Sequence, residues 1–461
     1  MLFQSPQFLF LFVATLGAYA AMRGDQGRLV ALTLASLLFY AYAGWRDVIL
    51  LAVLLVANHQ LSRVTERLAG TRRGLYALWA AVLFNLAPLI FYKYLYFLMQ
   101  IAAPAWGAEL GVERYEIPLG SSFYTFLLIA YHIDIHHGLV KRERQFVRMV
   151  LFSTFFAHVA GPIMRARELL PQFDHLRPLD YAGLRAGSVF ILLGLLKKVV
   201  VADQVAPLVD ALFGRSQTEA LSFFSAWGAG LGFGLQIYSD FSGYSDIALG
   251  LGLCFGIRLR RNFEYPYLAR DPSDFWRRWH ITLSEWFRDY VYIPLGGNRN
   301  GGAATLFNLA ATMVLCGLWH GASWTFIVWG GIHAALLAFY HLCRRPLQAL
   351  APLPAVLTFL VAMIAWVFFR AGSLAEAGSI AGSMLAPDAL GSAAEGWRCL
   401  GLALLLPGLQ YVERLAMSDE SALRAAWRGL PAWIKGGAAA AVAVLIVLHI
   451  HSQAVYIYFR F

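Results

Sequence analysis

Long apolar runs recur from one end of this sequence to the other, and they restrict its fold more than any other feature. Because 59% of the 461 residues are hydrophobic and only 14% are charged, the chain carries more apolar surface than one soluble core can bury. Runs of roughly 17–25 residues are typical of membrane-spanning helices. The sequence therefore predicts an all-α polytopic integral membrane protein. The candidate spans lie near residues 7–22, 28–44, 47–62, 75–102, 118–135, 148–164, 186–204, 220–237, 241–257, 305–320, 324–342, 352–370, 398–413 and 434–451.

The distribution of basic residues predicts the orientation of these spans. Residues 1–21 lack a basic n-region and a clear cleavage site, so we expect the first run to be a span and not a signal peptide. Arginine and lysine cluster after the first, third and fifth runs, whereas the connections near 44–47 and 103–118 contain few of them. By the positive-inside rule, the N-terminus lies outside the cytoplasm and the arginine-rich segment 258–299 lies on the cytoplasmic side or dips in from it.

The formal net charge of +10 is explained by these cytoplasmic loops, which face anionic lipid head groups. We expect no nucleic-acid partner, since the sequence has no basic soluble domain interleaved with aromatic residues. The four cysteines are scattered and form no CxxC pair, so they predict neither a metal site nor a disulfide framework. The polar stretches are too short to fold alone, which predicts a single membrane domain over residues 1–461.

His320 is the first candidate functional residue, because it stands between the apolar runs 306–319 and 325–340. An ionisable side chain at such a place is costly in hydrocarbon, and by default it faces the protein interior or a polar cavity. Histidine also suits proton transfer near neutral pH, since its unperturbed pKa is about 6.5. We therefore expect His320 to be catalytic, with the neighbouring Trp319 and Trp324 restricting water.

The segment 265–290 predicts an amphipathic helix that begins after Pro272, with Ser273 as its N-cap. Trp276 and four further large side chains recur at steps of three and four residues. The same spacing places Arg277, His280 and Ser284 on another face, where they would meet an anionic or polar ligand. The alternative is an interfacial helix whose Trp and Arg residues lie at head-group level.

Two carboxylates and three serines interrupt the apolar sequence at 236–246. Polar atoms at that depth must be satisfied within the protein, which predicts either a broken helix lining a cavity or a loop at the membrane surface. A spacing of six residues puts Asp240 and Asp246 on different faces of any continuous helix. They are therefore expected to be structural or pocket-shaping groups and not an acid-base pair.

His132 and His136 form an i, i+4 pair, which raises the question of a metal site. No third ligand follows at a zinc-site spacing, so we favour a histidine cluster at the edge of a loop and expect no bound metal. His333 and His341 show no sequence pattern that assigns them a role.

Six segments, in this order, resemble the bacterial branch of the membrane-bound O-acyltransferase family, with a core at about 118–324. Beyond that core, 365–370 and 456–461 are similar to the subgroup of alginate and peptidoglycan O-acetyltransferases, whereas His136-His137-Gly138 differs from the Tyr-Arg-Gly common in that subgroup. The six segments are 118–126, 160–163, 238–250, 274–284, 289–297 and 318–324.

The resemblance implies a fold with about 11 transmembrane helices plus re-entrant or interfacial helices, and a passage through the bilayer. It also implies that His320 is the catalytic histidine and that His280 is the family's second, more variable polar position. We expect substrate-binding roles for Trp276, Arg277, Ser284, Asp240, Tyr244, Trp319 and Trp324.

The implied activity moves an acetyl group from a cytoplasmic donor, acetyl-CoA, across a bacterial inner membrane for O-acetylation of an extracytoplasmic polysaccharide such as alginate. No bound cofactor is expected. The partners implied are membrane lipid, the polysaccharide and a periplasmic SGNH-hydrolase-like acetyltransferase that accepts the acetyl group. Two alternatives stay open: D-alanyl transfer toward teichoic acid, and a membrane transporter or flippase, which broken helices and buried charges also allow.

Overall fold

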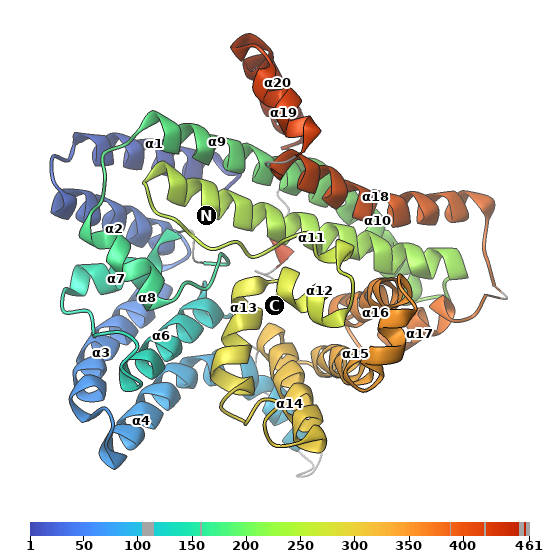
Figure 1. The fold of residues 1–461 in the computed structure, drawn as a ribbon, viewed down its shortest axis with the longest axis horizontal. Helices are drawn as coiled ribbons and strands as arrows, with labels where there is room; N and C mark the ends of the chain where they lie inside the picture. Colours follow the sequence, from blue (N-terminus) through green and yellow to red (C-terminus); the bar gives the residue numbers. More distant parts are fainter. Residues whose placement is uncertain (104–114, 157–158, 388, 419–420, 451–455, 458–461) are drawn as a thin grey trace. The chain divides into compact units, whose positions relative to one another are not determined.

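The computed structural model describes residues 1–103, 115–156, 159–387, 389–418, 421–450 and 456–457, and all regular structure within these ranges is helical (Figure 1). The predicted all-α class is therefore confirmed. The chain divides into two compact units, one formed by Met1–Leu193 with Tyr244–Arg261 and the other by Gly194–Gly243 with Asn262–Phe461. That residues 1–461 act as a single membrane domain stays a prediction.

The first unit contains most of the N-terminal helices. They are α1 (Pro6–Ala21), α2 (Asp25–Ala41), α3 (Trp45–Leu68), α4 (Arg72–Leu89), η1 (Ile90–Tyr94), α5 (Leu95–Ala102), α6 (Ser121–His136), α7 (Phe146–Thr154), α8 (Ala166–Leu169) and η4 (Leu170–Asp174). Ser5 caps α1 by accepting a hydrogen bond from the backbone N–H of Phe8 at 3.3 Å, and Pro6 fills the first helical position. α6 packs against both α3 and α4.

The second unit contains the C-terminal helices, and two helices, α9 (Tyr181–Leu195) and α11 (Phe223–Cys254), contribute residues to both units. The others are η5 (Leu196–Ala202), α10 (Asp203–Ser216), η6 (Pro266–Leu268), α12 (Pro272–Arg278), α13 (Ile281–Phe287), η7 (Arg288–Tyr292), α14 (Gly302–His320), α15 (Trp324–Ala349), α16 (Leu353–Arg370), α17 (Leu374–Met384), α18 (Ala393–Met417), α19 (Ala422–Gly429) and α20 (Ala432–His449).

Seven helical segments of the described chain are long and apolar enough to cross a bilayer, and each coincides with a run predicted from the sequence. The protein is accordingly a multi-pass membrane protein. The seven segments are Trp45–Leu68, Arg72–Ala102, Gly302–His320, Trp324–Ala349, Leu353–Arg370, Ala393–Met417 and Ala432–His449.

The predicted span at 148–164 is wrong, because α7 ends at Thr154 after nine residues. The hydroxyls of Ser153 and Thr154 donate to carbonyls one turn earlier, at 3.0 and 2.8 Å, a pattern that weakens helices. Pro162 then disfavours helical geometry in the residue before it.

The predicted interruption at 236–246 is also wrong, because α11 runs without a break for 32 residues. The helix accommodates Asp240 because partners distant in sequence satisfy its carboxylate. Lys198 Nζ lies 2.6 Å from Asp240 Oδ1, and the backbone N–H of Ile457 donates to Asp240 Oδ2 at 2.9 Å. Lys198 also pairs with Asp203 at 2.9 Å. Asp240 is thus held by a side chain and a backbone group from other parts of its unit.

His132 lies in the core of the first unit, not at the edge of a loop as predicted. Its side chain is fully buried, with Nε2 lying 2.8 Å from Asn58 Oδ1 and Nδ1 lying 3.1 Å from Thr65 Oγ1. Asn58 and Asn85 exchange two further side-chain hydrogen bonds at 2.9 and 2.7 Å. Through both ring nitrogens, His132 therefore connects α6 with α3.

Candidate active site

His320 is the last residue of α14, and two glycines allow the next helix to approach it closely. A Cβ at Gly317 would overlap the backbone oxygen of Phe326, and one at Gly330 would overlap that of Met313, so only glycine permits this contact between α14 and α15. Ser323 starts α15 by accepting a hydrogen bond from the N–H of Thr325 at 3.3 Å. The apolar sequence thus folds into a tight helical hairpin with His320 at its turn.

Aromatic rings surround His320, whose side chain is only 4% exposed. The ring centroids of Trp319, Trp329 and Phe369 lie 4.9, 5.2 and 5.1 Å from its imidazole. Such an enclosure limits the access of bulk water to the imidazole. Trp319 is buried, but Trp324, the other tryptophan predicted to restrict water, is 51% exposed at the start of α15.

His280 lies at a break in the segment that was predicted to be one amphipathic helix. The helix ends at Arg278 and restarts at Ile281, and His280 between them adopts a left-handed conformation with φ 42° and ψ 54°. Asn262 holds this corner, because its carbonyl accepts from the Ile281 N–H at 2.8 Å and its Oδ1 accepts from the Thr282 hydroxyl at 2.6 Å. A non-glycine residue in this conformation is uncommon and needs such support.

The break overturns the predicted shared face of Arg277, His280 and Ser284, because the left-handed residue changes the phase of the helix. His280 is fully buried, the Arg277 side chain is 65% exposed, and the Ser284 hydroxyl donates to the carbonyl of Trp279 at 3.0 Å. The predicted cap is also wrong. Asp271, and not Ser273, caps α12 by accepting from the N–H of Asp274 at 2.8 Å.

The structure brings the two catalytic candidates to the same tryptophan. The ring centroid of Trp319 lies 4.9 Å from His320 and 6.1 Å from His280, and Phe241 lies 4.7 Å from His280. Burial lowers the pKa of His280 to about 3, so its imidazole is neutral at physiological pH. A neutral imidazole can orient a substrate or a neighbouring side chain through one donor and one acceptor.

Asp240 and Tyr244, two of the predicted binding residues, make polar contacts of their own. Asp240 is engaged by Lys198, as described above. Tyr244 belongs to the first unit, where its hydroxyl accepts from the backbone N–H of Ala160 at 3.2 Å and its ring stacks on Phe3 at 4.7 Å. Substrate binding by these two residues stays a prediction.

His333 and Trp329 were missed by the sequence reasoning, although both lie beside the predicted residues. His333 on α15 is 1% exposed, and its ring lies 4.9 Å from Trp329 and 5.0 Å from Trp276. Trp329 in turn contacts His320. The signal that selected His320, an ionisable residue within an apolar run, applies equally to His333.

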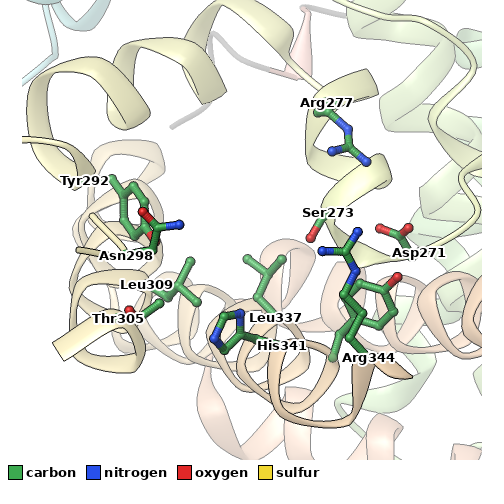
Figure 2. Close-up of a pocket in the computed structure, with 11 residues that line it drawn as sticks. Asp271, Ser273, Arg277, Tyr292, Asn298, Thr305, Leu309, Leu337, His341 and Arg344 are labelled. Carbon is green, nitrogen blue, oxygen red and sulfur yellow. The ribbon is translucent and has the colours of Figure 1, made fainter. Parts of the chain in front are cut away.

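A polar cavity of about 230 Å³ opens among α12, the segment after α13, and helices α14 and α15 (Figure 2). Figure 2 shows Arg277 and Arg344 on one side of it and Tyr292 and Asn298 on the other, with His341 below. Among the described residues that line it, only Asp271, which caps α12, carries a carboxylate. The lining residues are Asp271, Ser273, Arg277, Tyr292, Asn298, Thr305, Leu309, Leu337, Tyr340, His341 and Arg344.

One face of α15 connects this cavity with His320. Trp329, which contacts His320, and His341, which lines the cavity, are separated by about 18 Å along the helix at 1.5 Å per residue. His333 and Leu337 follow Trp329 at steps of four residues, so they project from the same face. The arrangement suits an extended ligand with an anionic end in the cavity.

Comparison with known proteins gives the same assignment as the sequence motifs. A model of the membrane-bound O-acyltransferase family matches residues 123–375. The chain is 40% identical to a probable alginate O-acetylase of Azotobacter vinelandii over 81% of this chain and 76% of that protein. It is 36% identical to a peptidoglycan O-acetyltransferase of Helicobacter pylori over 82% and 78% of the two chains. A teichoic acid D-alanyltransferase of Streptococcus thermophilus is 30% identical over 47% of this chain and 54% of that protein.

The matched residues include both histidine candidates and most of the core that the resemblance predicted. The predicted family and the predicted enzyme class are confirmed, and the alternative of a transporter or flippase loses its support. This chain belongs to the membrane-bound O-acyltransferase family and is a membrane-bound O-acyltransferase.

Proposed function

We propose that this protein transfers the acetyl group of cytoplasmic acetyl-CoA across the membrane for O-acetylation of an extracytoplasmic polysaccharide such as alginate. The observation that carries the proposal is the enclosed His320, a buried histidine at the turn between two membrane helices and within a ring of aromatic side chains. Relatives named for acetylation of alginate and peptidoglycan support the choice of group and acceptor.

The chemistry requires a base, because an alcohol is a poor nucleophile until it loses its proton. His320 accepts the proton of the acceptor hydroxyl while the oxygen attacks the thioester carbonyl. The C–S bond then breaks, and the CoA thiolate leaves and recovers the proton from the imidazolium. His280, neutral and next to Trp319, positions the reacting groups.

The polar cavity is the proposed site for the phosphate groups of the donor. Arg277 and Arg344 supply planar guanidinium groups that match phosphate oxygens, and His341 adds a third nitrogen donor. The Arg344 guanidinium forms no ion pair with the described residues, and Arg277 has only Asp274, at 3.8 Å. The path of about 18 Å along α15 is comparable with an extended pantetheine arm, which would carry the thioester to His320.

The proposed location is the inner membrane of a bacterium, with the N-terminus in the periplasm. The basic clusters identified in the sequence support this orientation, which places the arginine-rich segment 258–299 and its cavity on the cytoplasmic side, where acetyl-CoA is available.

A periplasmic SGNH-hydrolase-like acetyltransferase is the proposed acetyl acceptor. His320 is only 4% exposed, so a small hydroxyl-bearing group reaches it more readily than a polysaccharide chain would. A transient complex suffices for this handover, because it has only to orient the hydroxyl and then release it.

D-alanyl transfer toward teichoic acid remains the second candidate. The D-alanyltransferase similarity covers about half of this chain, whereas the O-acetylase similarity covers about four-fifths at higher identity. The greater coverage and identity of the O-acetylase relatives favour acetyl as the transferred group.

The test uses purified protein in proteoliposomes with radiolabelled acetyl-CoA, the partner acetyltransferase and alginate. We expect labelled alginate only when both proteins are present. Equal labelling without the partner would contradict the handover. A parallel assay offers a labelled D-alanyl carrier protein, and transfer from that donor but not from acetyl-CoA would overturn the acetyl assignment.

A further inference from the structure

Three polar atoms on one face of α15 are buried and lack a hydrogen-bond partner within the described residues. They are both ring nitrogens of His333 and the indole Nε1 of Trp329. His333 is 1% exposed and Trp329 is fully buried, so bulk water does not reach them. Their rings lie 4.9 Å apart, one helical turn from each other.

Their surroundings are aromatic. Phe275 stacks on His333 at 5.9 Å with an interplanar angle of 9°, and Trp276 approaches its edge at 5.0 Å. These rings provide apolar contact but no conventional hydrogen-bond acceptor or charge. Histidines in apolar membrane helices are costly, and buried polar atoms without partners are few in native proteins. The three atoms are therefore available to hydrogen-bond a bound ligand.

The position of His333 connects the two parts of the active site. Trp329 lies 5.2 Å from the His320 ring, while Leu337, one turn beyond His333, lines the polar cavity. On the opposite wall, Trp276 lies between Ser273 and Arg277, which line the same cavity. A donor that extends from the cavity to His320 along this face passes His333.

The chemistry of the unpartnered atoms specifies the group that they recognise. A neutral imidazole offers one N–H donor and one nitrogen acceptor, and the indole offers one N–H donor. An amide presents a carbonyl acceptor and an N–H donor, which is the complementary set. A carboxylate or phosphate would need a cation here, and an alkyl chain would leave the three atoms unsatisfied.

We propose that His333 and Trp329 bind an amide of the acyl donor's arm, which makes them specificity-determining residues for amide-bearing thioesters. This inference rests on the proposed acetyl transfer from CoA, whose arm carries two amides between its phosphates and its sulfur. Since Trp329 touches His320, the amide nearer to the thioester is the one bound.

The test compares two small donors, S-acetyl-N-acetylcysteamine, which keeps that amide, and S-ethyl thioacetate, which lacks it. The kcat/KM for each is measured with wild-type protein, with His333→Phe and with His333→Gln. We expect wild type to prefer the amide-bearing thioester by about tenfold, the effect of one or two hydrogen bonds. His333→Phe loses most of this preference, and His333→Gln, which keeps a donor and an acceptor, retains most of it.

A matched control changes the aromatic packing around His333 without removing a polar atom. Phe275→Leu alters the ring stacked on His333, and we expect it to keep the wild-type preference. An equal preference for the amide-bearing thioester in wild type and His333→Phe would overturn the assignment. The absence of this preference in wild type would also overturn it, and that measurement does not depend on whether any variant folds. If wild type uses neither small thioester nor acetyl-CoA, the proposed function itself fails.

Discussion

The Lys198→Met variant tests how the second unit holds charge in its interior. Lys198 Nζ lies 2.6 Å from Asp240 and 2.9 Å from Asp203, and its side chain is 1% exposed. Methionine preserves much of the length and apolar stem of lysine but removes the cation that pairs with two buried carboxylates. Removing one partner of a buried ion pair costs about 3–5 kcal/mol, so we expect a loss of stability of that size.

A second ion pair in the same unit provides the matched control. Arg215 and Glu219 are 2.8 Å apart, but their side chains are 49% and 56% exposed. Exposed helical pairs of this spacing contribute little to stability because solvent screens them, so Arg215→Gln is expected to leave the free energy of unfolding nearly unchanged. Because the two distances are similar, the comparison isolates the effect of burial.

The assay measures the free energy of unfolding by SDS titration in mixed micelles, followed by far-UV circular dichroism. Adding Asp203→Asn and Asp240→Asn to Lys198→Met removes both carboxylate charges and should recover most of the loss. If the free energy of unfolding of Lys198→Met stays within about 1 kcal/mol of the wild-type value, the pairing of buried charges is not what stabilises this region.

Four further predictions concern the site and the topology. His280→Ala should lower turnover less than His320→Ala does. Because burial depresses the pKa of His280 in the folded protein, wild type should lose stability as pH falls from about 6.5 toward 3. The His280→Gln variant should lose less stability than wild type over this pH range, and an identical acid sensitivity of the two proteins would refute the prediction. Arg344→Gln should raise the KM for acetyl-CoA about tenfold. The adjacent Arg345 does not line the cavity, so Arg345→Gln should leave this KM unchanged. A single cysteine at Arg142 in a cysteine-free background should react with an impermeant reagent only from the cytoplasmic side, and labelling of intact cells would reverse the orientation.

Local sequence signals predicted the parts of this protein that depend on apolar periodicity. The hairpin around His320 follows from two apolar runs joined by a short turn, and both features are visible in the sequence. The same reasoning, applied to every ionisable residue within a run, would also have selected His333. The sequence did not show that this residue faces the same aromatic cluster as His320.

Tertiary contacts decided the features that were predicted wrongly. The break at His280 depends on Asn262, which binds both the backbone and a side chain of the following turn. The continuity of α11 through Asp240 depends on Lys198, 42 residues earlier in the chain. Local sequence carries no information about partners at such separations. Helical periodicity therefore predicted a continuous helix in the first case, and the polar residues predicted an interruption in the second.

The transfer of acetyl by His320 is the central claim, and one measurement tests it most directly. Wild-type and His320→Ala proteins, shown to be equally folded and inserted by gel filtration and circular dichroism, are compared in proteoliposomes for transfer from radiolabelled acetyl-CoA to the partner acetyltransferase. Loss of a general base predicts a fall of about a hundredfold or more. Transfer by His320→Ala near the wild-type rate would remove His320 from the mechanism.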